Sequence, residues 1–128
     1  MMKELGLVAL GGAGGAVMRY LFVSFVQSVI GIGAPWGTLA VNVLGSFLMG
    51  FLFMVIVEQD MALAVEARLL LMVGFLGAFT TFSTFSMETL LLLHNHDWSA
   101  AATNILLSVG LCLVAVWAGF TAAELQYN

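Results

Sequence analysis

The chain has 128 residues, of which 62% are hydrophobic and 8% are charged, and its formal net charge is -4. A soluble domain carries about 25% charged residues, so a soluble fold of this length is excluded. Lys and Arg together number 3, too few for the phosphate contacts that nucleic-acid binding requires. The single Cys excludes an intramolecular disulfide, and no Cys and His spacing suits zinc. The composition therefore predicts an integral membrane protein that does not bind nucleic acid.

A helix that spans a bilayer needs about 20 mostly apolar residues, and the polar residues of this chain separate four such stretches. The first stretch superficially resembles a signal peptide, but its apolar character resumes beyond Arg19, so we expect it to remain as a helix. Pro35 and the glycines before it end this stretch, because the residue before a proline disfavours helix. The sequence thus predicts one all-α membrane domain, residues 1–128, with spans at about 5–30, 36–57, 67–93 and 98–123.

The topology of these spans is only weakly biased by charge. An even number of spans places both termini on one side of the membrane, where Lys3 and Arg68 would lie together. The other loops contain no Lys or Arg. The positive-inside rule therefore favours cytoplasmic termini, but by two charges to none.

Polar residues within spans are costly and usually face a partner, a cavity or a path. Arg19 lies about halfway along the first span. It either ties two helices together by bonding backbone carbonyls, or lends positive potential to an anion path. Both interpretations remain open at the level of sequence.

The second span carries three polar residues, Thr38, Asn42 and Ser46, four residues apart and hence on one helical face. They either hold helices together or coordinate a desolvated anion, since an Asn amide offers two donors. Four glycines of the first two spans are expected to be close-packing positions: Gly11, Gly15, Gly45 and Gly50.

The third span holds the least helix-like segment, with five hydroxyl residues among the seven from Thr80 to Ser86. Ser and Thr compete for backbone hydrogen bonds, so we expect the helix to break near the bilayer centre. Such a break is tolerated only where protein or a cavity satisfies the freed backbone groups, which can in turn bind ions. Glu88 follows and is either a hydrogen-bonded structural acid or a gate residue at the mouth of a path.

The fourth span places Asn104, Ser108 and Cys112 four residues apart, on one face. We interpret this ladder as a polar track, with packing as the alternative. No nucleophile and base pair, phosphate loop or cofactor motif is present, so an enzyme is not expected. Permeation is the natural functional class.

Three segments in this order, GGAGGAVMRY, PWGTLAVNVLGSF and GFLGAFTTFSTFSMET, resemble the bacterial fluoride channel family (CrcB/Fluc), and the resemblance extends over essentially the whole chain. It implies a dual-topology antiparallel homodimer with two pores in the bacterial plasma membrane. The homodimer would export fluoride passively and so confer fluoride resistance. The fold expected from the family has four transmembrane helices with a break in the third.

The resemblance also implies roles for particular residues. A structural sodium ion would be held by the backbone carbonyls of Gly77 and Thr80 in both chains, and Phe82 and Phe85 would be the paired pore phenylalanines. Cys112 departs from the family, in which a hydroxyl is more usual, and Ala78-Phe79 replaces the commoner Gly-Leu. The remaining path residues that the family implies are Arg19, Asn42, Ser83, Thr84, Glu88, Asn104 and Ser108.

Two other classes are weighed against a fluoride channel. A small four-helix dual-topology multidrug exporter is the main alternative, but its mechanism needs a carboxylate in the first span, where this chain has Arg19. The third class is a purely structural membrane protein, in which the intramembrane polar residues only join helices. A fluoride path is chemically reasonable because hydroxyls, amides and the positive edges of aromatic rings can replace the water around the ion.

Overall fold

A computed structural model describes residues 1–58 and 63–127, and within these ranges the chain is helical and has no strand. Two of the elements, η1 and η2, are π-helical, and the others are α-helical. In chain order the elements are α1 (Met2–Ile30), α2 (Trp36–Phe53), η1 (Met54–Glu58), α3 (Ala64–Ala67), η2 (Arg68–Leu76), α4 (Gly77–Phe79), α5 (Phe82–His94) and α6 (Trp98–Tyr127).

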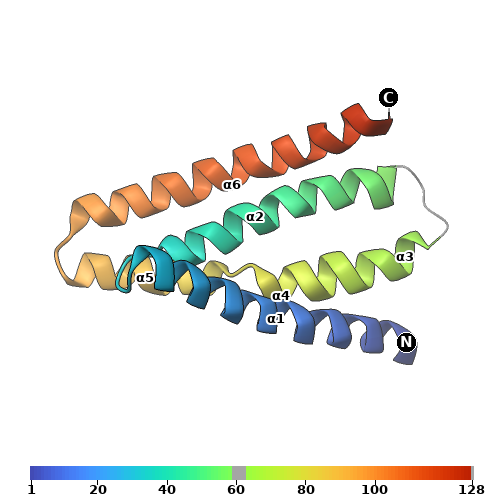
Figure 1. The fold of residues 1–128 in the computed structure, drawn as a ribbon, viewed down its shortest axis with the longest axis horizontal. Helices are drawn as coiled ribbons and strands as arrows, with labels where there is room; N and C mark the ends of the chain where they lie inside the picture. Colours follow the sequence, from blue (N-terminus) through green and yellow to red (C-terminus); the bar gives the residue numbers. More distant parts are fainter. Residues whose placement is uncertain (59–62, 128) are drawn as a thin grey trace.

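These elements combine into four rods that run back and forth along the molecule (Figure 1). Within the described part of the chain, four rods are long and apolar enough to cross a membrane: Met2–Ile30, Trp36–Glu58, Ala64–His94 and Trp98–Tyr127. The prediction of four membrane-spanning helices is therefore confirmed. Both termini lie at the same end of the bundle (Figure 1).

The turns between the rods have identifiable causes. Gly31 and Gly33 follow α1 with φ angles of 108° and 109°, which residues with a Cβ rarely adopt. Pro35 then precedes α2. At the other polar turn, Oδ1 of Asp97 accepts a hydrogen bond from the N–H of Ala100 at 3.1 Å and so caps the start of α6.

Glycines allow the rods to touch backbone to backbone in the half of the molecule that holds both termini. Gly11 and Gly15 of α1 are buried, and a Cβ on either would collide with the backbone of η2, at Leu70 and Phe75. The expectation that these two glycines are close-packing positions is confirmed. Gly74 of η2 faces α1 in the same way.

The second close contact joins α2 to α6. A Cβ on Gly50 would collide with the carbonyl of Val116, and a Cβ on Gly119 would collide with the carbonyl of Phe47. The expectation for Gly50 is also confirmed. Gly45 is close-packed as expected, but its neighbour is the side chain of Thr80 rather than a backbone.

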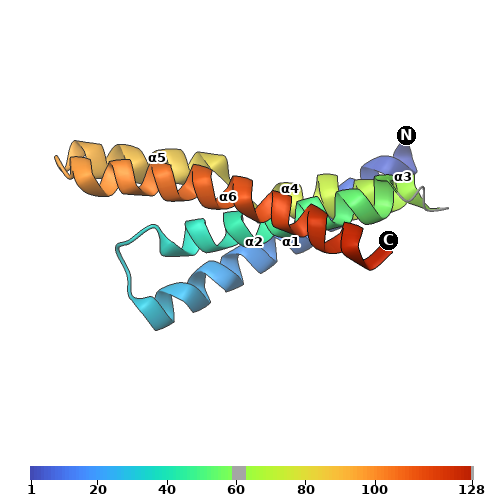
Figure 2. The same ribbon diagram turned by 90° about the horizontal axis from the view of Figure 1, so that it is seen from above.

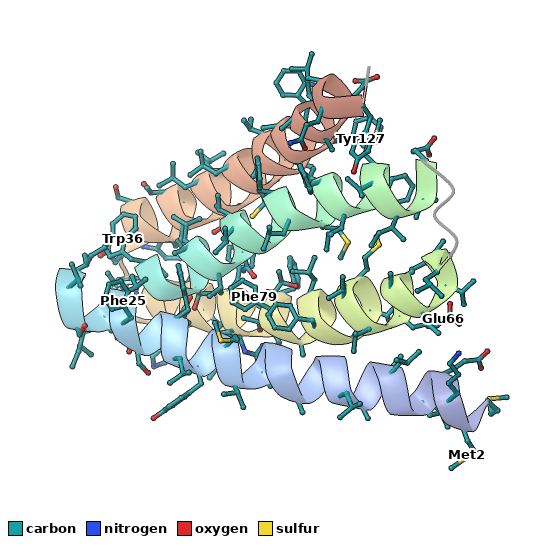
Figure 3. All side chains as sticks on the ribbon, turned by 45° about the vertical axis from the view of Figure 1, so that its right-hand side comes forward. Met2, Phe25, Trp36, Glu66, Phe79 and Tyr127 are labelled. Atoms are coloured by element: carbon teal, nitrogen blue, oxygen red, sulfur yellow. The ribbon has the colours of Figure 1, made fainter. Side chains whose placement is uncertain are left out.

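In the opposite half, α1 and the start of α2 diverge from α5 and α6 (Figure 2). A small aromatic core holds the bundle together where the two halves meet. Phe79 is 3% exposed and stacks on Phe75 with ring centroids 5.9 Å apart, while Phe22 of α1 meets it edge to face at 6.2 Å. Figure 3 shows Phe79 between the helices, whereas Met2 and Tyr127 lie at the end with the termini. This core fixes α4 against α1.

Candidate functional site

The third rod loses its helical geometry at Thr80 and Thr81. Both residues are extended, with φ and ψ of -84° and 157° at Thr80 and of -152° and 111° at Thr81. In a continuous helix the N–H of Thr81 would bond to the carbonyl of Gly77. It bonds instead to Oδ1 of Asn42 at 2.7 Å, so the Gly77 carbonyl loses its helical donor.

Asn42 of α2 satisfies the interrupted backbone with both ends of its side-chain amide. Its Oδ1 accepts the Thr81 N–H, and its Nδ2 donates to the Thr81 carbonyl at 3.0 Å. The two bonds supply what a neighbouring strand would supply to an extended residue. Because Nδ2 carries two hydrogens, one N–H of Asn42 remains for another acceptor.

Arg19 of α1 also contacts the interruption, at the neighbouring residue Thr80. Its Nη1 lies 3.4 Å from the carbonyl oxygen of Thr80, and the side chain is half-buried. This contact with a backbone carbonyl is the one expected if Arg19 ties two helices together. It also brings the positive charge of Arg19 to the interruption. The two interpretations of Arg19 are therefore compatible in one geometry.

Thr81 also begins α5, as its N-cap residue. Its Oγ1 accepts from the N–H of Thr84 at 3.1 Å, donates to Oγ1 of Thr84 at 3.0 Å, and lies 3.2 Å from Oγ of Ser83. Ser83 and Thr84 are exposed in the single chain. Sequence reasoning did not single out Thr81, although a hydroxyl residue just before a helical run is a known N-cap signal.

A pocket of about 410 Å³ lies between α2, α5 and α6, beside the interruption. Two aromatic rings line it, Phe82 and Phe85, whose centroids are 5.3 Å apart at an interplanar angle of 52°. Phe85 is 8% exposed, whereas Phe82 is 76% exposed. The polar side chains around the pocket come from three of the rods: Asn42, Ser46, Thr80, Thr81, Ser108 and Cys112.

Glu88 lies further along α5 and is held by α2. Oγ1 of Thr38 donates to its Oε1 at 2.7 Å, while Oε2 is buried and has no hydrogen-bond partner in the part of the chain that the structure describes. Glu88 is thus a hydrogen-bonded acid that joins two helices. Its second oxygen, Oε2, remains available to accept a hydrogen bond.

The expected ladder of the fourth span divides into two parts. Ser108 and Cys112 line the pocket, and Asn104 is 5% exposed and lies one turn away. Nδ2 of Asn104 donates to Oγ1 of Thr89 at 3.0 Å, and Oγ of Ser108 donates to Oδ1 of Asn104 at 3.4 Å. Sequence reasoning did not single out Thr89, although it is a further hydroxyl residue in the third span, one helical turn after Phe85.

Gly77 faces away from the core of the single chain. It is exposed, and a Cβ there would meet only the Met72 carbonyl, at 3.8 Å. The freed Gly77 carbonyl and the Thr80 carbonyl are hard oxygen donors of the kind that bind alkali cations. The Thr80 carbonyl already accepts from Arg19 at 3.4 Å and has its second lone pair left for an ion. The chemistry of the two carbonyls therefore fits the sodium ion that the family implies, although one chain supplies only two such oxygens.

Comparison with known proteins finds a family match over nearly the full length of the chain. Residues 6–120 match the model of a family described as CrcB-like protein, Camphor Resistance (CrcB). The chain belongs to the CrcB family. The resemblance noted from the sequence segments is therefore confirmed.

Several relatives are similar to this chain along most of its length. A protein of Hahella chejuensis is 54% identical over 124 residues, which cover 97% of each chain. A protein of Shewanella oneidensis is 52% identical over 118 residues, covering 92% of this chain and 94% of the relative. A longer protein of Methylococcus capsulatus is 50% identical over 124 residues, 97% of this chain and 54% of its own. All three are named fluoride-specific ion channel FluC.

Proposed function

We propose that this chain is a fluoride-selective ion channel, which lets fluoride leave the cytoplasm passively and so confers fluoride resistance. The observation that carries the proposal is membership of the CrcB family, whose similar members are named fluoride-specific ion channels. Ion channels are not enzymes, in agreement with the sequence-based expectation. Four apolar spans and the channel family support a multi-pass membrane protein, and the bacterial inner membrane is the location that we propose for it.

The pocket beside the interruption has the chemistry that a small, strongly hydrated anion needs. The free N–H of Asn42, the hydroxyl of Ser108 and the positive edges of Phe82 and Phe85 can replace water around fluoride. Arg19 adds positive charge at the interruption, which offsets part of the cost of removing the ion from water. An inside-negative membrane potential then drives the anion outward without any coupled energy source.

The assembly that we propose is an antiparallel homodimer with two pores. The exposure of Phe82, Ser83, Thr84 and Gly77 supports it, because these positions have little cover in one chain. A second copy in the opposite orientation would enclose them. The weak bias in Lys and Arg, two residues on one side of the membrane and none on the other, is compatible with insertion in both orientations.

A structural sodium ion would be held by the carbonyls of Gly77 and Thr80 from both copies. When bound, it would supply positive charge that satisfies the carbonyls freed by the interruption and stabilises the contact between copies. Lipid would surround the dimer. Glu88 and Asn104 would lie along the same path, with Thr38 and Thr89 as their partners.

Fluoride efflux from proteoliposomes, followed with a fluoride electrode, tests the proposal. We expect rapid release of fluoride once a permeant counter-ion balances the charge, and little release of chloride under the same conditions. Efflux no faster than that from protein-free vesicles would contradict the proposal. Uptake of a cationic drug driven by a proton gradient would instead identify the exporter alternative.

A further inference from the structure

A chain of hydrogen bonds leads from the backbone of α5 to the hydroxyl of Ser108. Oγ1 of Thr89 donates to the carbonyl of Phe85 at 2.8 Å and accepts from Nδ2 of Asn104 at 3.0 Å. Ser108 in turn donates to Oδ1 of Asn104 at 3.4 Å. All three side chains are buried, at 8% exposure or less, and Ser108 is the one that lines the pocket.

The direction of each bond follows from the number of hydrogens available. A hydroxyl has one hydrogen, and that of Thr89 is used on the Phe85 carbonyl, so Thr89 can only accept from Asn104. This turns the Nδ2 end of the Asn104 amide toward Thr89 and the Oδ1 end toward Ser108. The hydrogen of Ser108 is therefore drawn to Oδ1, which leaves its lone pairs for the pocket. Lone pairs have the wrong sign to bind an anion.

We propose that Asn104, oriented by Thr89, is a positioning residue that competes with fluoride for the hydroxyl hydrogen of Ser108. The inference rests on the proposed path past Ser108. The Ser108–Asn104 bond is long at 3.4 Å, and an anion is the stronger acceptor. The hydrogen therefore turns to fluoride when the ion arrives and returns to Asn104 when it leaves.

This competition sets how tightly fluoride is held at Ser108. A conducting path needs sites that bind strongly enough to admit the ion and weakly enough to release it. Without the competitor, Ser108 would bind fluoride more tightly and release it more slowly. The half-saturating fluoride concentration and the maximal efflux rate should then both fall.

The test measures efflux as a function of internal fluoride for wild type, Asn104→Leu and Thr89→Val. We expect the half-saturating concentration to fall about twofold to tenfold in both variants, the effect of one hydrogen bond. Thr89→Ser keeps the hydroxyl, so its half-saturating concentration should equal that of the wild type. Thr89→Val has nearly the original shape, so it carries the test if Asn104→Leu does not assemble.

The same measurements in a Ser108→Ala background separate this inference from the proposed path. Ser108→Ala alone should raise the half-saturating concentration, and Asn104→Leu should add nothing to it, because no hydroxyl hydrogen remains to compete for. An equal effect of Asn104→Leu in both backgrounds would mean that Asn104 acts by packing, and would overturn the inference but not the path. A Ser108→Ala channel identical to wild type would overturn both.

Discussion

The two halves of this bundle are held together by different interactions. In the half with both termini, α1 meets η2 and α2 meets α6 through glycines, backbone against backbone. In the half that contains α5, α1 and the start of α2 diverge from α5 and α6 (Figure 2). Side-chain hydrogen bonds of Asn42 and Thr38 join α2 to the third rod, and a bond of Asn104 joins α6 to α5. The first half is packed mainly through glycines and apolar side chains, with the exposed ion pair from Lys3 to Glu66 at its end. The second half places hydroxyl and amide side chains next to the pocket.

This difference suggests that the glycine-packed half of the chain serves mainly helix packing, whereas the half with the polar groups serves permeation. Small residues let membrane helices approach closely, and no polar group is needed where van der Waals contact suffices. The interruption at Thr80 and Thr81 exposes backbone groups that must find partners inside the protein. The same requirement that recruits Asn42 and Arg19 also concentrates donors beside the pocket. Substitutions should therefore affect folding in one half and ion flux in the other.

The largest expected effect is a folding defect in the glycine-packed half. Gly119→Leu would place a large side chain against the Phe47 carbonyl, where even a Cβ does not fit, so we expect little or no folded protein. The milder Gly119→Ala should lower stability by about 1–3 kcal/mol. Gly110→Ala, on the same helix, is the matched control, because nothing in the single chain lies within 4 Å of the added Cβ. The yield of folded protein and thermal unfolding in detergent are measured for all three variants. Equal stability of Gly119→Ala and Gly110→Ala would contradict the close contact at Gly119.

Next in size is the loss of the dimer through Gly77. A side chain at this exposed position has room in one chain, so Gly77→Leu should leave each chain helical. We expect it to disrupt dimer assembly and to abolish fluoride efflux, because the proposed sodium site and the second copy lie there. Circular dichroism measures the helicity, chemical cross-linking in membranes measures dimer assembly, and efflux from vesicles measures fluoride transport. A Gly77→Leu protein that still forms a conducting dimer would exclude the site.

Substitution of the two pocket rings is expected to reduce mainly the fluoride flux, with a smaller effect on folding and assembly. Phe82→Ile roughly keeps the volume but removes the ring quadrupole, so fluoride efflux should fall sharply while the dimer still forms. Phe85→Ile should also reduce efflux, with some loss of stability because Phe85 is buried. The electrode assay and size-exclusion chromatography distinguish flux from assembly. If both variants conduct like wild type, the rings serve only in packing.

The smallest effect is expected at Cys112, which lines the pocket one turn after Ser108. A thiol is a weaker donor than a hydroxyl, so Cys112→Ser should preserve fluoride efflux or raise it slightly. Ser108→Ala is the matched loss of a donor on the same face. It should lower the fluoride efflux rate by raising the barrier to permeation by an amount on the order of 1–3 kcal/mol. The opposite ranking of the two variants would show that this face of α6 serves in packing and that the path follows α5 alone.

Much of the architecture follows from local sequence. The four apolar stretches predict the rods because a bilayer-spanning helix depends on its own length and apolarity, not on its neighbours. Gly11, Gly15 and Gly50 were recognisable as packing positions for a similar reason: small residues in spans usually permit close contact. The hydroxyl-rich segment from Thr80 to Ser86 pointed to a region of low helix preference, and three sequence segments sufficed to place the chain in its family.

The tertiary structure decided which polar groups pair with which. The sequence left Asn42 open between joining helices and coordinating an anion, and the structure uses one of its two donor hydrogens on Thr81, a residue 39 positions away. Thr89 drew no attention in the sequence, and it orients Asn104 across 15 positions. A hydroxyl or amide in a membrane must bond to whatever acceptor the packing brings near, and its hydrogen can serve only one strong acceptor at a time. Residue type thus determined the donors available to the pathway, and only the packing of α2, α5 and α6 determined where those donors point.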